Sequence, residues 1–152
     1  MGFWGSLSNA LHQREWIGML LARLSVGPLF AISGGSKLFV PARRQQMRDT
    51  LREAGLPAPE LSAAVISSVE CVFGALLAIG FLTPICCLML GGVMVGALKT
   101  TVLPGIKAKS MTAWLGEFLY LPEVLYLVIL AWLFFSGPGW LSVDQLIASS
   151  IL

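Results

Sequence analysis

Charged residues are scarce in this sequence. Asp, Glu, Lys and Arg make up 12% of the 152 residues, whereas hydrophobic residues make up 57%. Soluble domains carry about 25% charge, so this composition leaves little room for a soluble protein. It favours a single domain, residues 1–152, in contact with the lipid bilayer. The sequence has no basic stretch interleaved with aromatic residues, and we expect no nucleic-acid partner.

Residues that hold redox cofactors or metals are also scarce. The chain has one histidine, and its three cysteines, Cys71, Cys86 and Cys87, form neither a CxxC pair nor a metal-ligand spacing. It has no GxGxxG motif for a dinucleotide. We therefore expect no haem, flavin or metal site, and we expect the cysteines to pack as small apolar residues. Any electron-transfer role would need a partner protein or a diffusible cofactor.

Long apolar stretches are what the sequence has instead. A membrane-spanning helix needs about 20 predominantly apolar residues. Four stretches of that kind occupy approximately residues 16–40, 61–81, 83–103 and 115–135. In the last one, Pro122 indicates that the helix either is kinked there or begins there. These patterns predict an all-α, polytopic membrane protein built as a four-transmembrane-helix bundle.

Three shorter amphipathic segments are expected to form helices at the membrane interface. They cover approximately residues 3–14, 42–54 and 142–151. In the middle segment, Met47, Leu51 and Ala54 are expected to face lipid while the arginines face water. Thr83 is expected to cap the third spanning helix, and Ser142 is expected to cap the last short helix.

Most cations lie in two of the connections between spans. The first-to-second and third-to-fourth connections, with their flanking helix ends, hold eight of the ten Lys and Arg residues. The positive-inside rule then places these basic connections in the cytoplasm and both chain termini outside.

Glu70 lies near the centre of the second span, where an ionisable side chain normally faces a partner, a cavity or a proton path. Arg23 lies inside the first span, and Glu123 is at the depth of Glu70 if the fourth helix is continuous. We expect Arg23 to meet Glu70, with Glu123 as a third member. Such a site suits a proton relay or hydrogen bonding to a quinone carbonyl. Alternatively, the Arg–Glu pair only ties two helices together, and Glu123 is an ordinary first-turn acid of a helix that begins at Pro122.

Lys37 lies at the end of the first span, where reaching to the interface explains its position. Five small residues precede it and would let another helix approach closely: Ala31, Ser33, Gly34, Gly35 and Ser36. Together with Arg23, Glu70 and Glu123, Lys37 completes the candidate intramembrane polar site.

Several motifs, taken in order, resemble one family over nearly the whole chain. They are Arg23, 34–39 (GGSKLF), 55–59 (GLPAP), Glu70 with Gly74, 80–84 (GFLTP), Glu123 and 137–144 (GPGWLSVD). Their order and spacing resemble the DoxX family of small four-helix bacterial membrane proteins. The resemblance implies a multi-pass protein of the bacterial inner membrane, related to the DoxD subunit of thiosulfate:quinone oxidoreductase. The polar residues that it carries over are Arg23, Lys37, Glu70, Glu123 and Asp144.

The residues and the resemblance together predict a quinone-interacting or accessory subunit of a membrane oxidoreductase system that handles sulfur compounds or oxidative stress. They do not predict a stand-alone catalyst. One alternative is a non-enzymatic scaffold that holds soluble oxidoreductases through its basic cytoplasmic face. Another is a small transporter or lipid-binding protein, for which four short helices would need to form a homo-oligomer.

Overall fold

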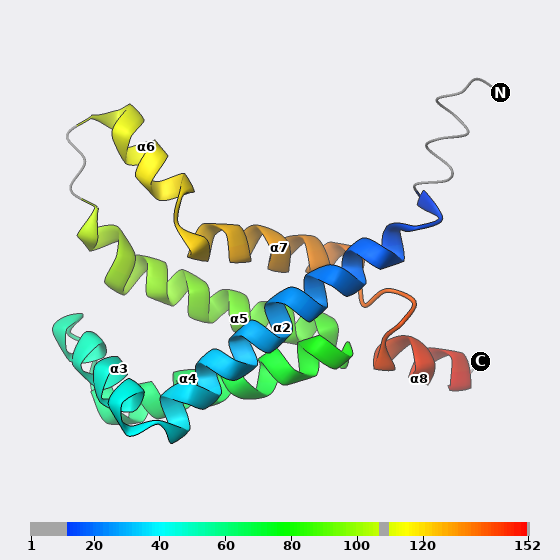
Figure 1. Cartoon of the computed structure of the whole chain (residues 1–152), viewed down its shortest axis with the longest axis horizontal. Coiled ribbons are helices and arrows are strands. Elements are labelled where there is room, and N and C mark those ends of the chain that lie inside the picture. The colour runs from blue at the N-terminus through cyan, green and yellow to red at the C-terminus, as the bar shows by residue number, and fades with distance from the viewer. Residues whose placement is uncertain (1–11, 107–109, 152) are drawn as a thin grey trace.

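The computed structural model describes residues 12–106 and 110–151, which are helical apart from short connections (Figure 1). The helices are α2 (Glu15–Phe39), α3 (Pro41–Glu53), α4 (Pro59–Ile79), α5 (Thr83–Ala97), α6 (Met111–Leu119), α7 (Pro122–Ser136) and α8 (Val143–Ile151). A π-helical turn, Leu98–Val102, and a 3-10 turn, Leu103–Gly105, continue α5. The interfacial helix expected at residues 3–14 lies outside the described residues, apart from residues 12–14.

Among the described residues, three helices are long and apolar enough to cross a membrane. They are α2, α4, and α5 with its continuation to Gly105. A fourth crossing results if α6 and α7 form one span, although these two helices are bent by 61° at their junction. The predicted fold class, an all-α polytopic membrane protein, is therefore confirmed, with three or four crossings.

The fourth predicted span, residues 115–135, is not one continuous helix. α7 begins at Pro122, and the preceding Leu121 is extended, with φ −71° and ψ 127°. Proline disfavours a helical conformation in the residue before it, and it has no N–H to continue the helical hydrogen bonds. Of the two options for Pro122, a kink or a start, the structure has a start after a sharp bend.

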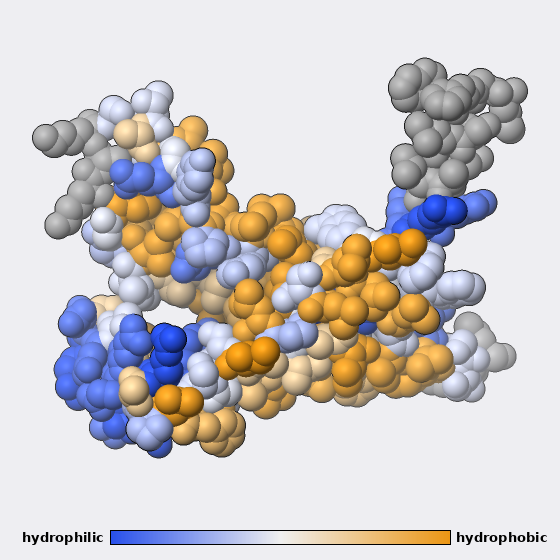
Figure 2. All heavy atoms as spheres, viewed as in Figure 1, coloured by the Kyte–Doolittle hydropathy of each residue, from blue (hydrophilic) through white to orange (hydrophobic). Residues whose placement is uncertain are grey.

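The surface of the long helices is mostly apolar. In each of the three, only 28% of an apolar 18-residue stretch is buried inside the protein. Figure 2 shows hydrophobic side chains over the middle of the molecule and hydrophilic ones gathered over α3, at lower left. A soluble protein would bury such apolar stretches, so this surface is suited to lipid, and the chain is a multi-pass membrane protein.

α2 and α4 pack antiparallel through glycines. A Cβ atom at Gly27 would lie only 2.6 Å from the backbone nitrogen of Ala78, and one at Gly34 would overlap the backbone nitrogen of Cys71. No side chain fits at these two positions without moving the helices apart. The small residues of α2 thus admit another helix, as predicted, and they determine which part of α4 each turn of α2 faces.

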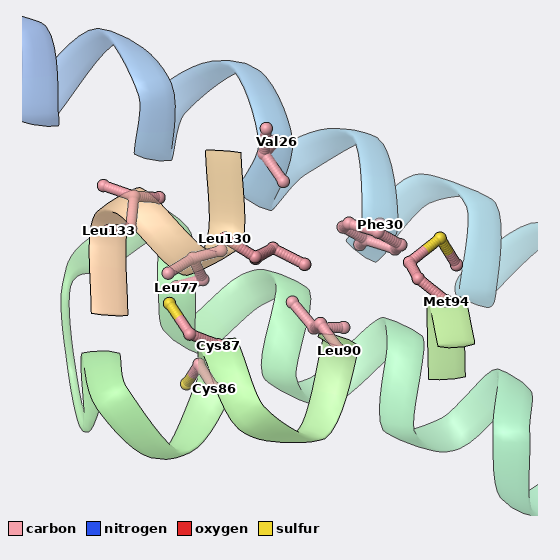
Figure 3. Close-up of a cluster of buried hydrophobic side chains, with 9 residues drawn as sticks. All are labelled: Val26, Phe30, Leu77, Cys86, Cys87, Leu90, Met94, Leu130 and Leu133. Carbon is pink, nitrogen blue, oxygen red and sulfur yellow. The ribbon is translucent and has the colours of Figure 1, made fainter. Parts of the chain in front are cut away.

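Side chains from α2, α4, α5 and α7 meet in one core, which joins the α2–α4 pair to the α5–α7 pair (Figure 3). Its buried members are Val26, Phe30, Leu77, Cys86, Cys87, Leu90, Met94, Leu130 and Leu133. Cys86 and Cys87 are free thiols among these apolar side chains. They pack as small apolar residues, which confirms the prediction made for them.

α3 folds back over the ends of α2 and α4. Leu51 is only 4% exposed, Met47 is half-buried, and both line a cavity of the protein. The expectation that they face lipid is therefore wrong. The reason is the short connections: a single residue, Val40, separates α2 from α3, and Gly55, in the left-handed region at φ +72°, reverses the chain after α3.

Candidate functional site

An ion pair lies near the middle of α4. The Nζ atom of Lys37 is 2.6 Å from Oε2 of Glu70, and the Glu70 side chain is only 4% exposed. The close approach of Gly34 to Cys71 sets the end of α2 beside the middle of α4. Lys37, in the last turn of α2, therefore turns inward to Glu70 rather than reaching to the interface.

The ion pair opens into a cavity of about 580 Å³, a size typical of small-molecule sites. We call it the acidic cavity, because two carboxylates and one amine line it. Its polar lining consists of Lys37, Glu70, Glu123, Thr50, Thr100 and Thr101. Its walls include the apolar side chains of Ile66, Val69, Leu88, Met89 and Val93. Three of the four predicted site residues thus line one cavity.

Glu123 reaches the acidic cavity from the first turn of α7. The structure thus has the first-turn acid that was the alternative for this residue, and the acid still lies at the same cavity as Glu70. Its Oε2 atom is buried and has no hydrogen-bond partner among the described residues. A buried carboxylate oxygen without a partner is costly, so this atom beside the cavity has an unmet hydrogen-bonding requirement.

The hydroxyl groups of Thr100 and Thr101 come from the π-helical turn that follows α5. The Thr100 hydroxyl donates to the carbonyl of Gly96 at 2.8 Å and lies 3.3 Å from the Thr101 hydroxyl. Single π-helical turns inside helices are rare and occur often at functional sites. Here the turn brings two neighbouring threonines to one cavity.

The acidic cavity therefore combines one amine, two carboxylates and three hydroxyl groups with apolar walls. Such a lining can hydrogen-bond carbonyl and hydroxyl groups at the polar end of an otherwise apolar molecule. Among the described residues, no three His, Cys, Asp or Glu side chains come together as a metal-binding group.

Arg23 lies elsewhere, at the opposite end of the α2–α4 pair. Its side chain is fully buried, and Nη2 donates to the carbonyl of Leu141 at 2.5 Å. Gly27, one turn further along α2, already packs against Ala78 near the end of α4. Arg23 thus faces the turn after α4 and does not meet Glu70. The expected Arg23–Glu70 pairing is wrong. It rested on the depth of each residue along its own helix, whereas contacts depend on which turns of α2 and α4 lie side by side.

Asp144 caps α5 from far along the chain. Its carboxylate accepts hydrogen bonds from the backbone N–H of Leu82, at 2.7 Å, and of Thr83, at 2.9 Å. Its own N–H donates to the carbonyl of Gly80 at 3.0 Å. Thr83 lies inside the first turn of α5, with its buried hydroxyl unpaired among the described residues, so the expectation that Thr83 is the cap is wrong.

Ser142 caps α8 as predicted, because its hydroxyl accepts a hydrogen bond from the N–H of Gln145 at 3.2 Å. The segment just before and at the start of α8 binds two distant parts of the chain. Leu141 accepts a hydrogen bond from Arg23, and Asp144 accepts one from the α4–α5 turn; we call this network the C-terminal clasp. Sequence reasoning marked Asp144 only through the family resemblance. Its partners lie more than 60 residues upstream, and no local pattern signals them.

Nearly all of the three long helices, together with the paired glycines and the buried Lys37–Glu70 pair, lies in the part of the chain that the comparison with known families recognises. The model of the DoxX family matches residues 18–103, more than half of the chain. The chain belongs to the DoxX family. The match includes Arg23, Lys37 and Glu70, whereas Glu123 and Asp144 follow it. No curated protein and no solved structure matches the chain significantly.

Proposed function

We propose that this DoxX-family protein binds a quinone headgroup in the acidic cavity and acts as a quinone-interacting or accessory subunit of a membrane oxidoreductase system. The observation that carries the proposal is the Lys37–Glu70 ion pair, which opens into a cavity of ligand size near the middle of an apolar helix. Ionisable groups at such depth are expensive and commonly mark ligand or proton pathways.

The lining matches the chemistry of a quinone. Lys37 has N–H groups to donate to a carbonyl oxygen, and the carboxylates of Glu70 and Glu123 can accept hydrogen bonds from the hydroxyl groups of the reduced form. Apolar residues such as Leu88 and Met89 provide a surface for the ring and its tail. Electrons would come from a partner protein, and the family resemblance points to systems that handle sulfur compounds or oxidative stress.

The orientation in a bacterial inner membrane follows from the positive-inside rule. α3 and α6 lie at one end of the molecule, and the start of α2 and α8 lie at the other (Figure 1). We place the end with α3 in the cytoplasm and the other end outside. The exposed arginines of α3, among them Arg43, Arg44 and Arg52, would then face soluble partners.

A scaffold role without a ligand is the second candidate, and the hydrophilic surface over α3 favours it (Figure 2). That surface can hold an acidic soluble oxidoreductase whether or not the acidic cavity is filled. The scaffold needs the arginines of α3, whereas the quinone site needs Lys37 and Glu70. The two functions are therefore separable by mutation.

The test is to purify the protein in mild detergent, extract bound quinone, and titrate the stripped protein with quinone. We expect wild type to retain and rebind quinone, and Glu70→Gln and Lys37→Met to bind it at least about tenfold more weakly, the loss expected for one hydrogen bond to a charged group. Glu117→Gln and Lys99→Met are matched controls, because both side chains are exposed and neither lines the cavity.

Thermal unfolding of each variant shows whether it is folded. If wild type neither retains nor binds quinone while folded, the quinone proposal fails. Capture of soluble partners by wild type, lost in an Arg43→Gln/Arg44→Gln variant, would then establish the scaffold role.

A further inference from the structure

A second cavity, of about 600 Å³, lies between α2 and α3. We call it the basic cavity. Lys37, Met47 and Thr50 line both cavities, so the second one lies directly across these residues from the first. The remaining residues of its lining are Leu29, Ile32, Ser33, Ser36, Arg43 and Gln46.

The charge of the basic cavity is opposite to that of the acidic one. Two cations, Lys37 and Arg43, line it, and none of its lining residues is an acid. Arg43 forms no ion pair within the described part of the chain. The Ser33 hydroxyl and the Gln46 amide, which also face this cavity, make no side-chain hydrogen bond among the described residues. The cavity thus offers positive charge and unused donors, which together suit an anion.

An apolar strip continues from this polar end. Leu29 and Ile32 lie one to two turns before Lys37 on α2, toward the middle of the span, and are 40% and 71% exposed. On a spanning helix, such side chains lie at the depth of acyl chains, and Arg43, at the start of α3, lies nearer the headgroups; Lys37 comes between these two levels along the chain.

We propose that the basic cavity binds an anionic phospholipid, with Lys37 and Arg43 on its phosphate and Leu29 and Ile32 against an acyl chain. A lipid fits this site better than free phosphate does, because the two cations and the apolar strip line one continuous cavity. Cations next to a membrane surface are attracted to anionic headgroups in any case. The basic cavity adds a specific binding site for one anionic headgroup.

Lys37 links this site to the acidic cavity. Its Nζ pairs with Glu70 at 2.6 Å, while its side chain also lines the basic cavity. A bound phosphate competes with Glu70 for the same ammonium group and so loosens the ion pair. We therefore expect an anionic lipid to change quinone affinity. This consequence rests on the proposed function, whereas lipid binding itself does not.

The test is a titration of the delipidated, detergent-purified protein by native mass spectrometry. The probes are phosphatidylglycerol, phosphatidylcholine and inorganic phosphate. We expect phosphatidylglycerol to bind more tightly than phosphatidylcholine, and Arg43→Gln to weaken it about fivefold, the typical contribution of one cation near an anionic surface. Arg52→Gln is the matched control, because Arg52 is exposed at the other end of α3 and pairs with Asp49; it should leave binding unchanged.

A second variant tests the apolar strip. Ile32→Ala should weaken phosphatidylglycerol binding and leave binding of inorganic phosphate as it is in wild type. Equal affinity for the two lipids, or equal losses in Arg43→Gln and Arg52→Gln, would overturn the site. Displacement of the lipid by millimolar inorganic phosphate, with no effect of Ile32→Ala, would overturn the lipid assignment in favour of free phosphate. None of these readouts depends on quinone.

Discussion

The two cations of α2 show how differently two charges on one membrane helix can be used. Arg23 is fully buried and held by a backbone carbonyl within the C-terminal clasp. Lys37 keeps a quarter of its side chain exposed, pairs with Glu70, and borders two cavities. A charge within a spanning helix is thus not by itself a sign of a ligand site.

The difference comes from what surrounds each charge. Around Arg23, Gly80 lets the guanidinium approach the α4–α5 turn, and the segment with Leu141 and Asp144 closes over it. These contacts join parts of the chain to one another. Around Lys37, the partner is a side chain, and open volume lies on both sides. We therefore assign a structural role to the Arg23 end and a binding role to the Lys37 end.

The largest expected effect is at the structural end. Gly80→Ala should lower the free energy of unfolding by about 2–4 kcal/mol. The left-handed conformation at φ +71° costs about 1 kcal/mol for alanine. The added Cβ also overlaps the Arg23 guanidinium and lies 2.6 Å from Cβ of Ser142, and such overpacking costs roughly 1–3 kcal/mol.

Gly55→Ala is its matched control, because Gly55 has φ +72° with open space around its Cβ position. It should cost only about 1 kcal/mol. Thermal and denaturant unfolding in detergent measures both losses. Equal losses would show that the approach of Arg23 to the turn contributes nothing to stability.

The next effect concerns the ion pair at the binding end. In a double-mutant cycle, Lys37→Met and Glu70→Gln should show a coupling energy in the range of about 0.5–3 kcal/mol, because each single variant leaves the other group without its partner. The exposed pair of Arg52 and Asp49, whose atoms are 3.8 Å apart, should couple by about 0.5 kcal/mol or less. A coupling energy at Lys37–Glu70 no larger than that of the exposed pair would show that partial burial does not strengthen the Lys37–Glu70 interaction.

The C-terminal clasp should matter for stability and leave ligand binding intact. Asp144→Ala removes the acceptor for two N–H groups at the start of α5 and should cost about 1–2 kcal/mol. Asp144→Asn keeps one acceptor oxygen and should cost less. Quinone bound per folded molecule should equal that of wild type in both. A fall in bound quinone as large as that in Glu70→Gln would show that the C-terminal clasp also contributes to ligand binding.

The smallest effect on stability is expected at Glu123. Glu123→Gln should not lower the free energy of unfolding, because the Oε2 atom of Glu123 has no partner to lose among the described residues and the variant removes a costly buried charge. Its quinone affinity should nevertheless fall about tenfold, as expected when a charged acceptor becomes neutral. Unchanged affinity, measured by the same titration, would exclude Glu123 from the quinone site.

Much of the fold is predictable because hydrophobic length and helix-breaking residues are local properties. The long apolar stretches correspond to α2, α4 and α5 with its continuation, and the glycine at position 34 supports the close helix contact expected there. The break before α7 is a direct effect of Pro122. The side of α3 that is buried was not predictable, because it depends on the two short connections that fold α3 back.

The candidate site is predictable as a list of residues and not as a set of contacts. Glu70 and Lys37 are recognisable from their places in apolar stretches, since charges are rare there. Which cation meets Glu70 depends on the register of α2 against α4. A shift of one helical turn moves each residue by about 5.4 Å along its neighbour, enough to exchange one partner for another.

The sequence alone determined that this chain is a helical membrane protein of the DoxX type and that a few charges lie within its apolar helices. The membrane class and the intramembrane charges follow from composition and local spacing, because the bilayer constrains every apolar segment separately, whereas the DoxX type follows from the resemblance of an ordered set of motifs to that family. Only the tertiary structure decided that Lys37, rather than Arg23, pairs with Glu70 and that Asp144 caps α5. Such pairings join segments far apart in the chain, and glycine contacts between packed helices select them.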